Sequence, residues 1–246
     1  GEDGIRKVNE YVVKWGVEEK LADPTVVVAD TTAQEAAIPH PNEMGLMASF
    51  VTAVVAASKK VGPALKAFVE KAATYFAAAK RKVREYRLFA KEKTKAVKDK
   101  MVAEMTTIVE KANGVLGQAL SHGAEGSARL HKYSKVAWSK LVHEHETMGK
   151  LVPQIRYWLK TGYVAANKII SLQIPELYAI VRGKVGKTVE FGLNWGITRL
   201  RGGFLMATLG ADKRELHDQR FAVRAVKDHI AKFGKAPRAY AYDRGG

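Results

Sequence analysis

A long stretch without strand-forming patterns is the feature that most constrains the fold of this chain. From Met44 to about Leu159 the sequence is rich in Ala, Lys, Glu and Val and has almost no strand signal. We therefore expect a large helical region, in which Pro63 begins a helix and Pro153 is a kink or a helix start. Breaks in this region are expected at Gly114, Gly117, Gly123 and Gly126.

Strand-like segments flank the helical region on both sides. The compact β-branched run Thr25–Ala29 is typical of a buried strand, and Asp30 follows it directly. After Gly162 the pattern changes to short apolar runs separated by turn residues, which predicts antiparallel hairpins. The expected strands are 25–29, 168–172, 177–181, 188–200, 204–209 and 238–242, and the expected flanking helices are 3–20 and 211–233.

The charge of the chain indicates a polyanionic partner. The 41 Lys and Arg residues exceed the 25 Asp and Glu residues, which gives a formal charge of +16 and favours nucleic acid first and an anionic membrane second. There is no cysteine, which excludes disulfides, thiolate zinc sites and a cysteine nucleophile. The longest apolar run, Leu46–Ala57, is shorter than the roughly 20 residues of a membrane span, and no signal peptide is visible, so a soluble protein is expected.

Two aspartates share one context, because Asp30 and Asp243 each follow an apolar strand and precede a small or polar turn. A single Asp after a strand usually caps a helix or makes a turn. In α/β sheets, however, catalytic groups gather at the carboxyl ends of strands, and carboxylate oxygens suit hard divalent cations. Two such metals about 4 Å apart could clamp the attacking and leaving oxygens of a phosphodiester.

Three ordered sequence blocks resemble DDE-class insertion-sequence transposases. The first catalytic block of that family resembles the segment VVADTTAQEAAIPHPNEMGLM, and its central β-block resembles KIISLQIPELYAIVRGKVGKTVEFG. The closing segment AYAYDRGG resembles the family's strand with the second catalytic aspartate. Together the blocks span residues 26 to 246.

The resemblance implies an α/β fold, with an RNase H-like catalytic core and a large helical insertion between the first strand and a β-meander. The core would comprise residues 1–43 and 163–246, and the insertion residues 44–162. It further implies a transposase in which Asp30 and Asp243 are catalytic and bind Mg²⁺ or Mn²⁺. The implied partners are transposon terminal repeats and target DNA, and no membrane is expected. A homo-oligomer is left open. The implied location is the bacterial cytoplasm, at the nucleoid.

The chain departs from the family pattern at two places. The family's third carboxylate, a Glu on a later helix, has no counterpart in a sequence that ends three residues after Asp243, and the usual N-terminal DNA-binding segment is short or missing. We therefore expect an incomplete copy that binds DNA without cutting it. One alternative is a non-catalytic DNA-binding remnant. Another is a membrane-surface protein, which is disfavoured because the basic residues are not confined to one helix face.

Two basic segments are candidate DNA contacts. The segment Lys80–Lys100 holds ten basic and three acidic residues, several of them three or four positions apart, and the hairpin loop 182–187 is also basic. A solvated helix face is the alternative for the first segment. The expected DNA-binding residues are Lys80, Arg81, Arg84, Arg87, Lys91, Arg182, Lys184 and Lys187.

Other acidic and histidine residues are weaker candidates. Glu190 and Glu35 could assist a metal site, but a structural Glu in the meander and a loop residue are the favoured interpretations. His143 and His145 lie two positions apart, so on a helix they diverge by roughly 200° and cannot share a metal. A solvated charged face is expected there.

Overall fold

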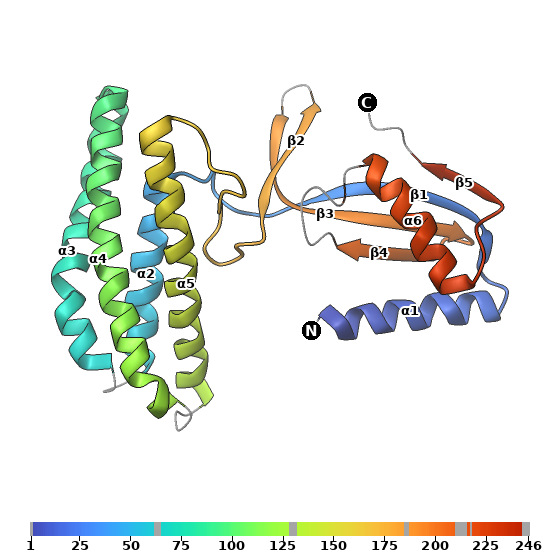
Figure 1. The fold of residues 1–246 in the computed structure, drawn as a ribbon, viewed down its shortest axis with the longest axis horizontal. Helices are drawn as coiled ribbons and strands as arrows, with labels where there is room; N and C mark the ends of the chain where they lie inside the picture. The colour runs from blue at the N-terminus through green and yellow to red at the C-terminus, as the bar shows by residue number, and fades with distance from the viewer. Residues whose placement is uncertain are drawn as a thin grey trace. The chain divides into compact units, whose positions relative to one another are not determined.

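The computed structural model describes residues 2–61, 65–127, 132–184, 187–209, 216 and 218–242. The chain divides into a sheet unit, made of Gly1–Ala37 and Tyr178–Gly246, and a helical unit, Ile38–Leu177 (Figure 1). Its described part is a mixed α/β protein with six α-helices and one mixed sheet of five strands. The helical unit is inserted after the first strand, as the sequence predicts, but its borders lie at 37/38 and 177/178 rather than at 43/44 and 162/163.

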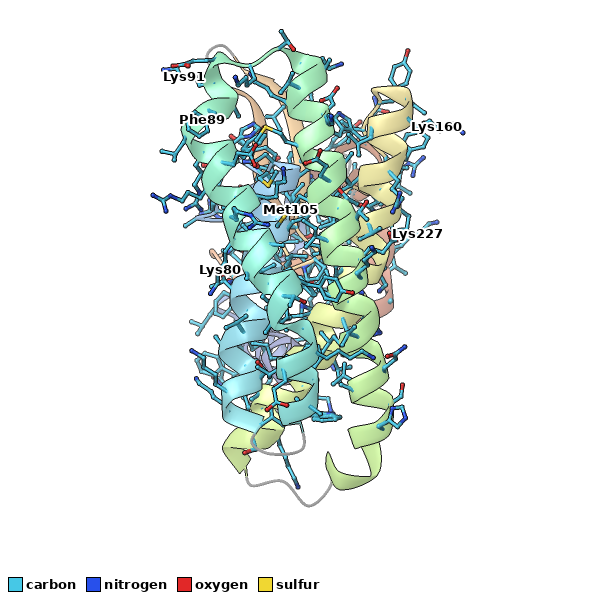
Figure 2. The ribbon with its side chains drawn as sticks, turned by 90° about the vertical axis from the view of Figure 1, so that its left-hand side faces the viewer. Lys80, Phe89, Lys91, Met105, Lys160 and Lys227 are labelled. Carbon is cyan, nitrogen blue, oxygen red and sulfur yellow. The ribbon has the colours of Figure 1, made fainter. Side chains whose placement is uncertain are left out.

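Four long helices form the helical unit. These are α2 (Glu43–Val61), α3 (Lys66–Phe89), α4 (Lys95–Ser127) and α5 (Lys132–Thr161), with a short 3-10 turn η2 (Ala90–Glu92) after α3. Apolar residues three or four positions apart on each helix face a common core, because that spacing puts them on one side. Met47, Phe50 and Met105 are fully buried there, and Figure 2 shows Met105 between the helices.

The predicted glycine breaks in the helical unit are wrong, because α4 continues from Lys95 to Ser127 through all four glycines. A Cβ at position 117 would lie 2.6 Å from Cε1 of His145, and one at position 123 would lie 2.5 Å from Cη2 of Trp138. These glycines therefore let α5 approach α4 closely. Pro153 lies inside α5, so it does not start a helix, and Pro63 falls outside the described residues.

The expected strand over 168–172 is also absent, since this described segment is irregular. Side chains of α5 take over the backbone hydrogen bonds that a neighbouring strand would make. The Ile169 N–H donates to Oε1 of Gln154 at 2.9 Å, and the Leu172 carbonyl lies 2.7 Å from Nε2 of His143. Ile169 and Leu172 are buried and belong to the core of the helical unit. Their apolar character thus reflects packing on helices.

The sheet unit has the strand order β2-β3-β1-β5, with β4 also pairing with β3. Its strands are β1 (Asp23–Glu35), β2 (Tyr178–Lys184), β3 (Lys187–Arg201), β4 (Leu205–Leu209) and β5 (Ala239–Tyr242). β3 is antiparallel to β1, β2 and β4, which confirms the predicted meander. β5 pairs with β1 in parallel. The strands at the two ends of the chain are therefore neighbours.

Two helices cover one face of this sheet. From Val27 to Thr32, residues of β1 alternate between buried and exposed, the pattern of a strand with one covered face. α1 (Glu2–Glu18) packs Val13 against Val27, whereas α6 (Asp218–Phe233) packs Phe221 against Ala29. Val28, Asp30 and Thr32 point to the opposite face, which we call the open face.

Candidate active site

Asp30 lies in the middle of β1, not at the end of a strand as predicted. The strand continues for five residues to Glu35, because Thr31 and Thr32 pair with Gly196 and Trp195 of β3. Asp30 is exposed on the open face opposite Ile197, and its Oδ1 accepts a hydrogen bond from the Thr31 N–H at 2.7 Å. The carboxylate is therefore accessible and held against its own backbone.

The strand that leads to the second predicted aspartate lies directly beside Asp30. The parallel register pairs Val26 with Ala239 and Ala29 with Tyr242, so the predicted adjacency of the two strands is confirmed. Tyr242 is the last described residue of β5, and Asp243 lies outside the described residues. Asp30 directly follows Ala29, the last residue of β1 that pairs with β5.

Side chains of α6 and β5 hold this edge of the sheet in place. The Tyr240 hydroxyl donates to the Ala222 carbonyl at 2.7 Å, and its ring stacks on Tyr242. Buried His229 lies between two carbonyls, with Nε2 at 2.7 Å from Pro24 O and Nδ1 at 3.0 Å from Lys235 O. These contacts tie the beginning of β1 to the segment that precedes β5.

Two further residues of the open face were not among the sequence-based candidates. Trp195 is opposite Thr32 and donates from its indole N–H to Oε1 of Gln34 at 2.7 Å. Arg199 is exposed and lies opposite Val28, two positions along β3 from the partner of Asp30. The alternation of residues along β3 could have indicated Arg199, but only once its register with β1 was known.

The other acidic candidates do not join Asp30. Glu35 is five positions further along the same strand, so it faces the opposite side of the sheet. Glu190 pairs with Ile180 of β2, seven positions before Ile197 along β3, or roughly 24 Å away by strand geometry. Among the described residues, no three His, Asp or Glu side chains gather closely enough to hold a metal ion. Within that part of the chain, Asp30 is an exposed carboxylate that no two further His, Asp or Glu side chains join.

His143 and His145 of α5 make structural contacts and do not form a metal site. The prediction that this segment is a solvated charged face is wrong. His145 Nδ1 lies 2.9 Å from Asn113 Oδ1 on α4, and His143 contacts the Leu172 carbonyl. Glu144 between them is buried, with 1% of its surface exposed. Although this segment is rich in charged residues, one face of it is buried in the protein.

The basic candidates lie on α3 and on the β2–β3 hairpin. Lys80, Arg81, Arg84 and Arg87 are exposed on α3, and Lys91 is exposed in η2. Figure 2 labels Lys80 and Lys91. Arg182 and Lys184 belong to β2 and Lys187 to β3, but their side chains lie outside the description.

Lys82 of α3 differs from these residues because it is paired. Its Nζ lies 2.6 Å from Glu104 and 3.1 Å from Glu85, and the Glu104 contact raises the pKa of Lys82 most. This cation therefore serves the packing of α3 on α4.

Within the described residues, α2 is the one helix long and apolar enough to cross a membrane. Half of its most apolar 18-residue window is buried inside the protein, and α2 supplies Met47 and Phe50 to the core of the helical unit.

Comparison of the chain with protein-family models, with curated proteins and with solved structures finds no match.

Proposed function

We propose that this chain carries the catalytic core of a DDE-type transposase with an RNase H-like fold. One observation carries the proposal: β1, which holds Asp30, pairs in parallel with β5, whose sequence runs directly into Asp243. The parallel pairing ends at Ala29 and Tyr242, directly before Asp30, and in α/β proteins ligands and catalytic groups gather where parallel strands end. The antiparallel partner β3 and the helices α1 and α6 hold this pair from the other sides.

In this function, Asp30, on the open face, and Asp243 would hold divalent cations. Bound Mg²⁺ supplies the activation of water and the stabilisation of charge on the leaving oxygen. Arg199 is exposed on the same face and offers a guanidinium to a phosphate of the substrate. The cations of α3, η2 and the β2–β3 hairpin would contact the DNA backbone, which positions the substrate without reading its sequence.

Metal binding tests the catalytic part of the proposal. We expect the 246-residue chain to bind Mn²⁺ weakly in titration calorimetry, because two aspartates leave a metal pair under-coordinated. Asp30→Asn and Asp243→Asn should each weaken this binding by about tenfold or more, whereas Glu35→Gln, on the other face of β1, should leave it unchanged. An Asp30→Asn variant with unaltered Mn²⁺ binding would refute the assignment of the site.

DNA binding tests the second part. Charge reversal at Arg84, Arg87 and Lys91 should weaken duplex binding and lower the slope of log K against log salt by about one for each lost phosphate contact. Lys71→Glu, on the opposite side of α3, is the matched control. A slope that stays the same in the triple variant would show that this helix does not meet DNA.

A non-catalytic DNA-binding protein is the second candidate function. Its support is the exposed basic row on α3. Salt-dependent DNA binding without any Mn²⁺ binding at Asp30 would favour this function.

A further inference from the structure

A groove between α2 and α3 combines an apolar floor with three cations. It has a volume of about 390 Å³, within the range of ligand-binding clefts, and lies wholly inside the helical unit. Lys80, Arg84 and Arg87 line its α3 side. Their spacing of four and three residues puts them on one face of the helix, over a length of roughly 10 Å.

These three cations have no anionic partner in the part of the chain that the structure describes. No carboxylate lies within ion-pair distance of Lys80, Arg84 or Arg87 there, in contrast to Lys82, which pairs with Glu104 and Glu85. One side of α3 is thus neutralised by α4, and the groove side keeps an excess of three positive charges. A ligand with negative charges along one edge would complement it.

The rest of the groove is apolar and has little means to read a nucleotide. Ala48 and Val51 of α2 and Val83 of α3 line it, and Leu88, with 59% of its surface exposed, extends the apolar lining. Among the described residues, no aromatic ring lines the groove on which a base could stack. The hydroxyl of Thr52 already donates to the Ala48 carbonyl at 2.9 Å. Phosphates alone would use the cations and leave the apolar floor exposed.

We propose that this groove binds an acidic amphipathic helix of a partner protein. Such a helix would place apolar side chains between α2 and α3, and its carboxylates, spaced three and four residues apart, would meet Lys80, Arg84 and Arg87. A ligand with one anionic group would contact one or two of these cations, whereas a row of carboxylates would contact all three. The small side chains of Ala48 and Thr52 let a third helix approach closely.

One consequence concerns regulation. Lys80, Arg84 and Arg87 are also proposed DNA contacts, so a bound acidic helix would exclude DNA from this part of α3. That consequence rests on the proposed function, whereas binding of the helix itself does not.

Fluorescence anisotropy with a labelled model peptide tests the proposal on the full chain. The probe is a helical peptide of about 18 residues with Leu along one face and three Glu at positions i, i+4 and i+7 beside it. Two control peptides replace every Glu by Gln or every Leu by Ser. We expect the acidic peptide to bind at least about tenfold more tightly than either control.

Variants of the groove locate the binding. Arg84→Gln with Arg87→Gln should weaken binding of the acidic peptide by about tenfold. Thr52→Trp fills the α2 side of the groove without changing charge and should abolish peptide binding, while Thr52→Ser and Lys71→Gln should retain it. Circular dichroism confirms that each variant is folded.

Several outcomes would overturn the proposal. Equal binding of the acidic and Gln peptides, or full binding by Thr52→Trp, would show that the groove does not recognise this partner. Loss of duplex DNA binding in Thr52→Trp would assign the groove to DNA. Binding of dodecyl phosphate that Thr52→Trp abolishes, with no binding of the peptide, would assign it to a small amphiphile. A chain that binds the peptide but no DNA would refute the proposed DNA contacts and leave the groove assignment intact.

Discussion

Glu144 occupies a core position of α5 that other members of the same stripe fill with apolar side chains. Ala137, Leu141, Met148 and Leu151 are buried at the spacing of three and four residues that also includes Glu144. Its Oε2 has no hydrogen-bond partner in the described part of the chain. Burial raises the pKa of this carboxyl from 4.5 to about 7, and the nearby charges of Lys140 and His143 lower it only in part.

We expect Glu144 to make stability depend on pH. Because the pKa of Glu144 is higher in the folded state than in the unfolded state, the folded state binds the proton more tightly. The free energy of unfolding therefore falls as pH rises from about 4.5 to about 7, by about 3 kcal/mol. Below this range the carboxyl is neutral in both states, and above it the carboxyl is ionised in both. Glu144→Gln should remove this loss, so the variant should be more stable than the native chain at pH 8 and similar to it at pH 4.

Urea unfolding of both proteins at several pH values measures the difference, and other titrating groups cancel because both chains contain them. Parallel pH dependence of the two proteins would contradict the assignment.

At the scale of elements, glycines decide how closely two helices pack. Gly114 and Gly117 lie one turn apart in α4, but only position 117 faces α5 closely. A Cβ at 117 would meet the His145 ring, which Asn113 holds through Nδ1, whereas a Cβ at 114 would meet nothing within 4 Å. Of these two glycines, only Gly117 is required by the contact between α4 and α5.

This pair makes a matched test of helix packing. Gly114→Ala should stabilise the protein by about 1 kcal/mol, because alanine favours a helix more than glycine does. Gly117→Ala gains the same propensity but should be destabilising overall, by about 1–3 kcal/mol, because the methyl group forces His145 out of its place. Thermal unfolding of the two variants measures the contrast. Equal stabilisation by both would show that α5 moves away at little cost.

At the scale of the whole molecule, the helical unit has a core of its own that includes the irregular segment before β2. Ile169, Ile170 and Leu172 are buried, and Lys168 pairs with Glu43 of α2. Residues 163–177 therefore belong with the helices rather than with the sheet.

We expect a fragment of residues 38–177 to fold without the sheet unit. It should show helical circular dichroism and unfold cooperatively, since its core closes within these borders. A fragment of residues 44–162, the borders expected from sequence, should be less stable by roughly 3 kcal/mol or more, because it loses the buried side chains of Ile169, Ile170 and Leu172. If both fragments unfold at the same urea concentration, the segment 163–177 contributes nothing to this core.

Sequence patterns determined the type and order of most elements. Apolar spacing of three and four residues predicted α1, and a helix-forming composition without strand signals predicted the helical insertion. Short apolar runs with turn signals predicted β1, the meander and β5. These patterns are local consequences of helix and strand geometry, so they can be recognised in a single chain. They also indicated that Asp30 and Asp243 each follow an apolar strand.

Tertiary structure decided what local patterns leave open. The run Lys168–Leu172 has the pattern of a strand but packs on α5, where Gln154 accepts the backbone hydrogen bond of Ile169. Gly117 and Gly123, which suggest helix breaks, instead lie at the contact between α4 and α5. Register with β3 placed Asp30 and Arg199 on the open face and set Glu35 and Glu190 apart from them. The groove between α2 and α3 joins residues that are about 30 positions apart in the sequence. Each of these results depends on contacts between segments remote in sequence, which no local periodicity encodes.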